Sequence, residues 1–469
     1  MKTKILFLIL ILVTLLLCSC GSPEGVEENK KYETINLNIY NWGEYISDED
    51  DEECGLFDVN AAFEEYFNTT LADKYGFYVK VNYSTYATNE DMFAKLSNSA
   101  VAYDVVVPSD YMIQKMVENN MLRPLDYSIL TNYGNIDDEF KNMPYDPDNM
   151  YSVPYTYGMV GIIYNSEFVK AEDVVDESWN LLWNQNSKGE SLSYQGKILQ
   201  FNNPRDAFAT AMYKNGLDIN SDNPEDWNKA LEELKKQKPI LQGYVNDEIF
   251  NKMKGASAYI APYFAGDFLT MAADNNDLRF YYPSEGTNYF VDAFCIPKTS
   301  HNDENSPNYK AANEYINYMI GREAATANAL YIGYASPNKA VVEYEYYQEM
   351  LDYNYSVYNE DETECLVDAW EILYGKSKEE ANVNYPHKNP AYENYKISPD
   401  GVDIQTHVNE LWESLKTENS TEAWIHVTSI AIVVGVLGFA IQTTYVKKKR
   451  SKFYRDRDRE LKKQRQINK

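Results

Sequence analysis

Histidine and cysteine are scarce in this chain, which has four histidines and five cysteines among its 469 residues. His426 falls within a long apolar run, and His301, His387 and His407 stand in no spacing typical of a nucleophile's partner or of a metal site. The sequence also lacks the G-x-S-x-G, phosphate-loop and H-E-x-x-H motifs. These absences argue against an enzyme, so we expect no catalytic residue, no metal site and no cofactor.

Positive charge is also in short supply, because 43 Lys and Arg face 72 Asp and Glu, for a net charge of −29. Many of the basic residues gather in the C-terminal segment 447–469, so the rest of the chain is more acidic still. Such a field repels nucleic acid and attracts cations, although many secreted proteins are acidic only for solubility. We therefore expect no nucleic-acid partner.

Residues 1–19 read as the leader of a secreted lipoprotein. Two lysines precede the apolar run 5–17, which is too short to span a bilayer comfortably and is typical of a secretory signal. The letters L-C-S-C-G-S that follow resemble a bacterial lipobox, with Cys20 as the lipidated first mature residue. The alternative is a cleaved signal with an incidental cysteine. A polar linker, residues 20–34, comes next.

A second apolar run, residues 423–446, contains no charged residue and is followed by the four basic residues 447–450. Its length and its positive flank predict a transmembrane helix with a basic cytoplasmic tail at 447–469, preceded by a stalk at 416–422. The alternative is a buried core helix. On the first interpretation the chain is anchored in the cell membrane, with its large portion on the extracellular or periplasmic face.

Only Cys54, Cys295 and Cys365 remain for disulfides once the leader is removed and Cys20 is acylated. An odd set allows at most one bridge. Cys295 stands in an apolar segment and reads as a small buried hydrophobe.

The portion between the two apolar runs is long enough for two domains of ordinary size. Strand-like and helix-like segments alternate along it, which predicts an α/β fold with mostly parallel sheets and ligands at the carboxyl ends of the strands. The expected strands are 35–42, 78–83, 104–107, 151–164, 196–201, 256–261 and 290–296. The expected helical segments are 59–66, 89–97, 109–119, 204–215, 224–237, 311–319, 322–331, 343–375 and 402–415.

One strand, in the segment 282–297, carries an unusual pair of side chains. Its alternation places Phe290 and Asp292 on one face, with Tyr289, Val291 and Ala293 on the other. An aromatic ring beside a carboxylate attracts an organic cation. The alternative is an ordinary buried strand with one acid at its edge, and these residues alone leave both interpretations open.

Several short strings occur in a fixed order over residues 36–345. They are Y-N-W-G-E-Y at 40–45, S-T-Y-A-T-N-E-D-M-F-A-K-L at 84–96, A-Y-D-V-V-V-P-S-D-Y at 102–111, V-P-Y-T-Y-G at 153–158, N-N-P-R-D at 202–206, F-V-D-A-F-C-I-P at 290–297 and I-G-Y-A-S-P-N at 332–338. In this ordered set the chain resembles the PotD-like spermidine/putrescine substrate-binding proteins of ABC importers. The resemblance implies a two-lobed, type II periplasmic-binding-protein fold that closes over a polyamine, here with an added C-terminal transmembrane helix.

The resemblance also implies how the chain is divided and what it works with. Lobe 1 would comprise residues 35–153 and 290–336, and lobe 2 would comprise 154–289, with the C-terminal helices 337–415 mainly in lobe 2. The partners would be a polyamine ligand, ABC permease subunits and, through them, an ATPase.

Ligand-binding residues are implied position by position, as aromatic rings around the polyamine and carboxylates on its ammonium groups. Seen singly, Trp42 and Tyr111 read as core residues and Asp206 as a helix cap; their joint placement at strand ends favours a site. The implied set is Trp42, Glu44, Tyr45, Ser109, Asp110, Tyr111, Asn203, Asp206, Phe264, Phe290, Asp292 and Tyr334.

The chain departs from the family pattern at several of these positions. The family's threonine after the tryptophan is Gly43, and one of its two acids at a strand-to-helix turn is Asn203, which cannot neutralise an amine. Asp110 and Asp267 stand near enough in sequence to replace that carboxylate. Phe264 and Phe290 take the place of tryptophans, which weakens cation–π attraction. Another organic cation, or a role as a polyamine sensor, therefore stays open.

Overall fold

The computed structural model describes residues 31–98, 102–246, 248–299, 301–359, 361, 363–374, 388–390 and 398–417. The predicted leader 1–19 with Cys20, most of the linker, the predicted span 423–446 and the basic tail 447–469 lie outside these residues. In the part that is described, no helix has the length and apolarity needed to cross a membrane.

The chain forms two compact units. The first contains the described residues up to Gly161, Tyr263–Phe280 and those within Asn288–Tyr392, and the second contains Ile162–Pro262, Tyr281–Thr287 and the C-terminal helix. The boundaries fall inside strands, because β4 (Ser152–Asn165), β7 (Ile260–Phe264), β8 (Leu278–Tyr281) and β9 (Thr287–Cys295) each continue from one unit into the other.

The first unit is built on a sheet with strand order β2-β1-β3-β9-β4, and the short strand β12 (Lys388–Pro390) also pairs with β9. β1 (Thr34–Trp42) runs parallel to β2 (Tyr78–Tyr86) and β3 (Val105–Val106), whereas β9 is antiparallel to β3 and β4. The sheet is therefore mixed, and the expectation of mostly parallel sheets is corrected here because the returning strand β9 runs against its neighbours.

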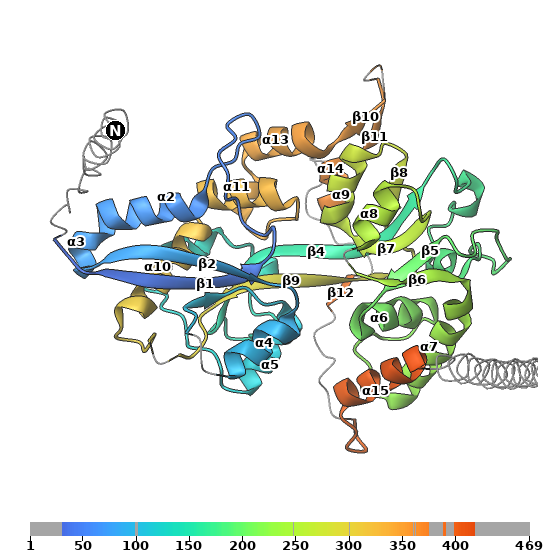
Figure 1. Ribbon diagram of the computed structural model, residues 1–469, viewed down its shortest axis with the longest axis horizontal. Helices are drawn as coiled ribbons and strands as arrows, with labels where there is room; N and C mark the ends of the chain where they lie inside the picture. Colours follow the sequence, from blue (N-terminus) through green and yellow to red (C-terminus); the bar gives the residue numbers. More distant parts are fainter. Residues whose placement is uncertain are drawn as a thin grey trace, which may run out of the picture. The chain divides into compact units, whose positions relative to one another are not determined.

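Helices cover both faces of this sheet. α2 (Val59–Tyr66), which continues through a π-helical turn into α3 (Ala72–Tyr75), lies with α10 (Pro307–Met319) and α11 (Arg322–Ile332) on one face, and α4 (Asn89–Ser97) and α5 (Asp110–Glu118) lie on the other (Figure 1). The core between α2 and α10 is aromatic, with the rings of Phe63 and Tyr315 edge to face at 5.1 Å. Burial of such rings stabilises this layer.

The second unit has its own short parallel sheet, with β5 (Ile198–Phe201) between β7 and β6 (Leu241–Val245). α6 (Pro204–Lys214), α7 (Pro224–Gln237) and α15 (Ile404–Thr417) lie together on one side of it, and α8 (Glu248–Lys254) lies on the other (Figure 1). Gln200, on β5, donates from Nε2 to Thr210 Oγ1 at 3.0 Å and to Gln237 Oε1 at 3.2 Å, so these three buried polar side chains are paired with one another.

The segment expected to be helical over 343–375 is interrupted. After α12 (Lys339–Val342), the helices α13 (Glu345–Tyr355) and α14 (Ala369–Tyr374) are separated by the hairpin of β10 (Val357–Tyr358) and β11 (Cys365–Val367). α13 and α14 pack against α9 (Ala265–Asp274) in the first unit, whereas α15 packs against α7. The structure therefore divides the C-terminal part between the units, rather than placing 337–415 mainly in the second.

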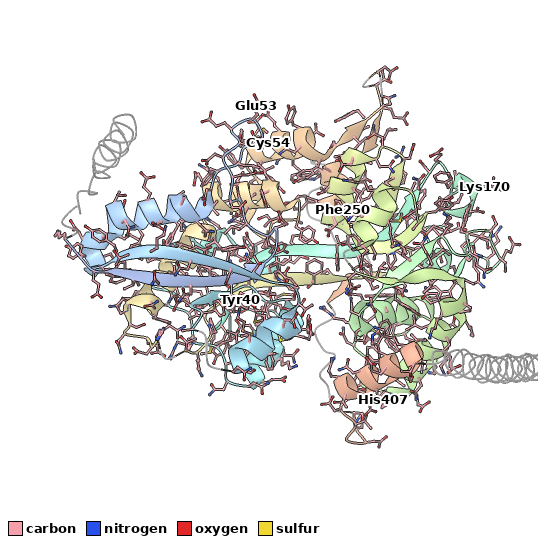
Figure 2. The ribbon with its side chains drawn as sticks, viewed as in Figure 1. Tyr40, Glu53, Cys54, Lys170, Phe250 and His407 are labelled. Atoms are coloured by element: carbon pink, nitrogen blue, oxygen red, sulfur yellow. The ribbon has the colours of Figure 1, made fainter. Side chains whose placement is uncertain are left out.

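The three described cysteines form no disulfide. Cys295 is fully buried in β9, and burial raises the pKa of its thiol, so it behaves as a small core residue. Cys54 lies with Glu53 in the loop beside α13 (Figure 2), where its carbonyl accepts a hydrogen bond from Asn354. His407 lies on α15 with its ring 3.2 Å from Asn228 Oδ1.

Asp104 is a fully buried carboxylate next to β3, and burial raises its pKa to about 6. Its Oδ2 accepts hydrogen bonds from the Asn38 backbone N–H at 2.8 Å and from Asn308 Nδ2 at 3.0 Å, while its Oδ1 has no hydrogen-bond partner among the described residues. The charged form of this group therefore opposes folding.

We expect Asp104→Asn to change how stability depends on pH. The folded state holds the proton more tightly than the unfolded chain, so stability falls as pH rises from about 4 to about 6. Relative to the parent, the variant should gain roughly 3 kcal/mol of unfolding free energy between about pH 4 and about pH 7.5. Urea unfolding at both pH values measures this, with the exposed Asp148→Asn as control. A gain that is the same at both pH values would refute it.

Candidate ligand-binding site

Asp292 lies in the middle of β9 with only 3% of its surface exposed. The Tyr45 hydroxyl donates a hydrogen bond to Asp292 Oδ2 at 2.6 Å. The Tyr45 backbone carbonyl accepts from Asn41 Nδ2 and from the Tyr155 hydroxyl, which fixes the turn after β1. Burial and the charge of Asp292 raise the pKa of Tyr45, so its phenol stays protonated and remains a donor.

A second tyrosine and carboxylate pair lies in the same unit. The Tyr334 hydroxyl donates to Asp267 Oδ2 at 2.6 Å, and burial together with Asp267 raises the pKa of this phenol. Asp267 stands in the first turn of α9, and Tyr334 follows Gly333, which ends α11 at a φ of 71°. A Cβ at Gly266 would lie 1.6 Å from the Tyr334 ring, so only glycine leaves room for that ring.

Aromatic rings connect the two pairs. The ring of Tyr334 lies edge to face against Tyr45 at 5.8 Å and against Phe290 at 5.9 Å, and Phe290 meets Phe264 in the same way at 5.4 Å. Phe290 stands opposite Gly158 on β4, where a Cβ would come within 2.6 Å of its ring. The structure thus brings Tyr45, Phe264, Phe290, Asp292 and Tyr334 together with Asp267, and rings with carboxylates suit an organic cation.

Trp42, Ser109 and Tyr111 form an adjoining group at the ends of β1 and β3. Trp42 donates from Nε1 to the Val107 carbonyl at 2.9 Å, and its ring packs against Tyr86. Ser109 forms an isolated antiparallel bridge with Asp292, which places it beside that carboxylate. Asn89 Nδ2 donates to the hydroxyls of both Ser109 and Tyr111, and the Tyr111 hydroxyl donates to Glu90 at 3.1 Å.

Asp110 and Glu44 have different surroundings from the central residues. Asp110 is fully buried, and its two oxygens accept hydrogen bonds from the backbone N–H groups of Tyr111 and Val291, at 2.6 and 3.1 Å. It therefore holds β9 to the start of α5. Glu44 is exposed at a φ of 52°, and its carboxylate accepts a hydrogen bond from the Tyr331 hydroxyl at 3.0 Å.

Asn203 and Asp206 lie in the second unit, at the turn from β5 to α6. Asn203 caps the helix, because its Oδ1 accepts from the Asp206 backbone N–H at 2.9 Å, and its Nδ2 donates to Asp206 Oδ2 at 2.9 Å. Pro204 at the first helical position fits this start. In the described part of the chain, no group of three or more His, Cys, Asp or Glu is placed to hold a metal ion.

Four neighbours of this cluster were not predicted as site residues: Tyr155, Thr156, Gly158 and Gly266. All but Gly266 belong to the V-P-Y-T-Y-G string, and a glycine inside a strand signals a close approach by another group. Gly158 meets that description, since it faces the Phe290 ring. Thr156 carried no signal, because its contact with Tyr45 depends on a strand register that the sequence does not specify.

A comparison against known protein families agrees with the fold. The family model described as "Bacterial extracellular solute-binding protein" matches residues 61–352, more than half of the chain. The chain therefore belongs to the bacterial extracellular solute-binding proteins, a family of binding proteins rather than enzymes.

Two similar proteins within this comparison are named as polyamine-binding periplasmic proteins. The chain is 32% identical over 305 residues to the spermidine/putrescine-binding periplasmic protein of Salmonella typhimurium, covering 65% of this chain and 78% of that protein. It is 28% identical over 320 residues to the putrescine-binding periplasmic protein PotF of Escherichia coli, covering 66% of this chain and 79% of that one. The predicted resemblance to the PotD-like proteins is confirmed.

A solved structure shows the same fold. The spermidine/putrescine ABC transporter substrate-binding protein PotD of Streptococcus pneumoniae aligns with a TM-score of 0.59 at 29% identity, covering 81% of this chain and 98% of that one. The periplasmic-binding-protein-like α/β fold expected from the sequence is therefore confirmed, with a mixed sheet in the first unit.

Proposed function

We propose that this protein binds a polyamine, putrescine or spermidine, outside the cytoplasm and delivers it to an ABC importer. The observation that carries the proposal is the pair of tyrosine-bound carboxylates, Asp292 and Asp267, joined by the rings of Tyr45, Tyr334 and Phe290. In this proposal the methylene chain of the polyamine packs on the rings, and each of its terminal ammonium groups pairs with a carboxylate.

Each implied residue has a part in this proposal. Asp292 and Asp267 neutralise ammonium groups, with Asp267 as the carboxylate that replaces the family acid now present as Asn203. The rings of Trp42, Phe264, Phe290 and Tyr334 supply stacking surface, and Ser109 and Tyr111 supply hydroxyl groups. Glu44 adds negative charge, and Asp110 supports β9 through its backbone contacts. Asn203 and Asp206 are proposed as ligand-binding residues on the strength of the family resemblance alone.

The partners follow from the family. The relatives are named as periplasmic binding proteins, and the Streptococcus pneumoniae structure is that of an ABC transporter substrate-binding protein. We propose that the two units are the lobes of such a protein, and that permease subunits with their ATPase receive the ligand. We also propose that acylated Cys20 and the apolar run 423–446 tether the chain to the cell membrane, with the tail 447–469 in the cytoplasm.

Calorimetric titration of the full chain in mild detergent tests the ligand. Putrescine, spermidine, spermine and arginine are titrated at one salt concentration, because the proposal assigns affinity to paired ammonium groups rather than to positive charge as such. We expect saturable binding of putrescine or spermidine and none of arginine. Binding of arginine alone, or of no amine, would refute the proposal.

The anchor is tested by fractionating cells that express Cys20→Ala, which cannot be acylated. We expect the variant to remain in the membrane fraction, because an apolar run of this length spans a bilayer without help from a lipid chain. Recovery mainly in the medium or periplasm would show that residues 423–446 do not span. A second variant truncated before residue 423, with Cys20 intact, isolates the contribution of the lipid.

A further inference from the structure

Thr156 lies directly opposite Asp292, on the neighbouring antiparallel strand β4. Its side chain is 2% exposed, and its Oγ1 is 2.7 Å from the Tyr45 hydroxyl oxygen. The register of β4 on β9 shifts between Pro154 and Thr156, and beyond that irregularity Thr156 stands level with Asp292. This arrangement joins three side chains from three segments of the first unit.

The direction of the hydrogen bonds in this group is fixed by proton count. An ionised carboxylate only accepts, so Tyr45 gives its single hydroxyl proton to Asp292 Oδ2 across 2.6 Å. The Tyr45 oxygen is then left as an acceptor, and Thr156 is the donor across 2.7 Å. The chain therefore runs from Thr156 to Tyr45 to Asp292, and each bond in such a series polarises the next.

We propose that Thr156 is a positioning residue for the ligand-binding carboxylate: its hydroxyl directs the Tyr45 proton onto Asp292 and thereby keeps Asp292 ionised for a bound ammonium group. This inference takes the identity of the ligand from the proposed function. The series of hydrogen bonds from Thr156 to Asp292 does not depend on it. Loss of the Thr156 hydroxyl would remove the hydrogen bond that polarises the Tyr45 hydroxyl. The Tyr45 proton would then stabilise the charge on Asp292 less, and the buried carboxylate would bind a proton more readily.

Other titratable groups also lie near Asp292, and they are the same in the parent and in the Thr156 variants. The phenols of Tyr86 and Tyr155 lie within its electrostatic reach, and both donate their protons to backbone carbonyls, of Val107 and Tyr45. Burial raises the pKa of both phenols, so neither ionises in the range of the measurement. Asp110, at the start of α5, accepts hydrogen bonds from the backbone of Tyr111 and of Val291, the residue before Asp292.

The test compares Thr156→Val, which keeps the shape and removes the hydroxyl, with Thr156→Ser, which keeps the hydroxyl. Putrescine affinity is measured between about pH 5 and about pH 8, where a carboxylate with a raised pKa begins to protonate. We expect Thr156→Val to weaken binding roughly threefold to tenfold, with a loss that grows as pH falls. We expect Thr156→Ser to stay within about twofold of the parent.

Tyr45→Phe provides the matched background, because it removes the link between Thr156 and Asp292. Thr156→Val should then change affinity by less than about twofold, since the two substitutions break the same chain. An equal loss in both backgrounds, or a loss that does not depend on pH, would show that Thr156 acts by packing alone and would overturn the proposal.

A measurement without ligand separates this proposal from the proposed function. Aspartate labelled with ¹³C at its carboxyl carbon reports the titration of Asp292, assigned by its absence in Asp292→Asn. We expect Thr156→Val to raise that pKa by at least about half a unit and Thr156→Ser to leave it in place. An unshifted titration in Thr156→Val would overturn the proposal even if the parent binds polyamines, and a shift would support it even if the parent binds none.

Discussion

Asp292→Asn is expected to weaken putrescine binding at least about 30-fold, which corresponds to ~2 kcal/mol. Asparagine has nearly the same shape and still accepts a hydrogen bond from Tyr45, so the substitution removes charge and little else. An ammonium group bound beside a side chain that is 3% exposed would then be buried without its counter-charge. Calorimetric titration of the variant measures the loss.

A control variant and a measurement of folding test whether this loss of affinity is specific to the site. Asp104→Asn removes another fully buried carboxylate of the same unit, whose hydrogen bonds go to Asn38 and Asn308, and we expect it to leave putrescine affinity within about twofold of the parent. Circular dichroism should be unchanged in Asp292→Asn, because the backbone pairing of β9 needs no side chain. A change of less than about threefold in the affinity of Asp292→Asn would remove this residue from the site.

The regular elements that carry clear local signals were predictable. Pro224 starts α7 and the amphipathic pattern carries it to Gln237, as the sequence indicates, and Thr88 caps α4. α9 was missed because it begins with Ala265 and Gly266, and its N-cap residue Phe264 makes no side-chain capping bond. Helix formation there depends on tertiary packing against α13 and α14, which a local pattern does not reveal.

Strands with weak local signals were missed or displaced. β6 contains Gly243 and lacks a clear alternation, so it was not predicted. The strand expected at 256–261 begins instead at Ile260, because Ala256 has a φ of 52° in the turn after α8. The second difference lies where turn geometry competes with an apolar stretch.

The residue types of the candidate site were predictable, but their partners were not. Tyr45 and Asp292 are 247 positions apart, and only the packing of the turn after β1 onto β9 brings them within 2.6 Å. Asp267 was predicted only as one of two acids that could replace the carboxylate lost at Asn203, and its contact with Tyr334 depends on the space above Gly266. Pairing between distant side chains is a property of the assembled sheet and helices, so sequence pattern supplies the candidates and the fold supplies the contacts.

The contacts seen in the structure change which carboxylates are counted in the candidate site. The number of carboxylates governs which polyamine the site favours. The resemblance implied Asp206 and Asp292 as acids, with Glu44 at the rim. It offered Asp110 or Asp267 as a replacement for the acid lost at Asn203. In the structure Asp110 is occupied by two backbone N–H groups, whereas Asp267 is bound to a tyrosine that contacts Phe290 and Tyr45. Asp267 is therefore the better candidate, and the first unit then offers two carboxylates, the number that a diamine needs.

Position 203, which the resemblance implies as a ligand-binding position, offers a way to change that preference. Asn203 Nδ2 donates to Asp206 Oδ2 at 2.9 Å, so Asn203→Asp replaces this hydrogen bond with two carboxylates at close range. Aspartate still caps α6, because its oxygen accepts from the Asp206 N–H as Asn203 does. The two carboxylates repel each other unless a proton or a cation lies with them, and a bound ammonium group relieves that repulsion.

We expect Asn203→Asp to strengthen spermidine binding roughly tenfold and putrescine binding by no more than about threefold. Spermidine carries three positive charges and putrescine two, so an added carboxylate favours the ligand with the higher charge. Asn202→Asp is the control, because it adds the same charge one position earlier on an exposed side chain that accepts from Lys416 at 2.8 Å. Both variants are titrated with both amines at one salt concentration. Equal gains for the two ligands, a loss for spermidine, or the same selectivity in Asn202→Asp would show that position 203 does not set the preference.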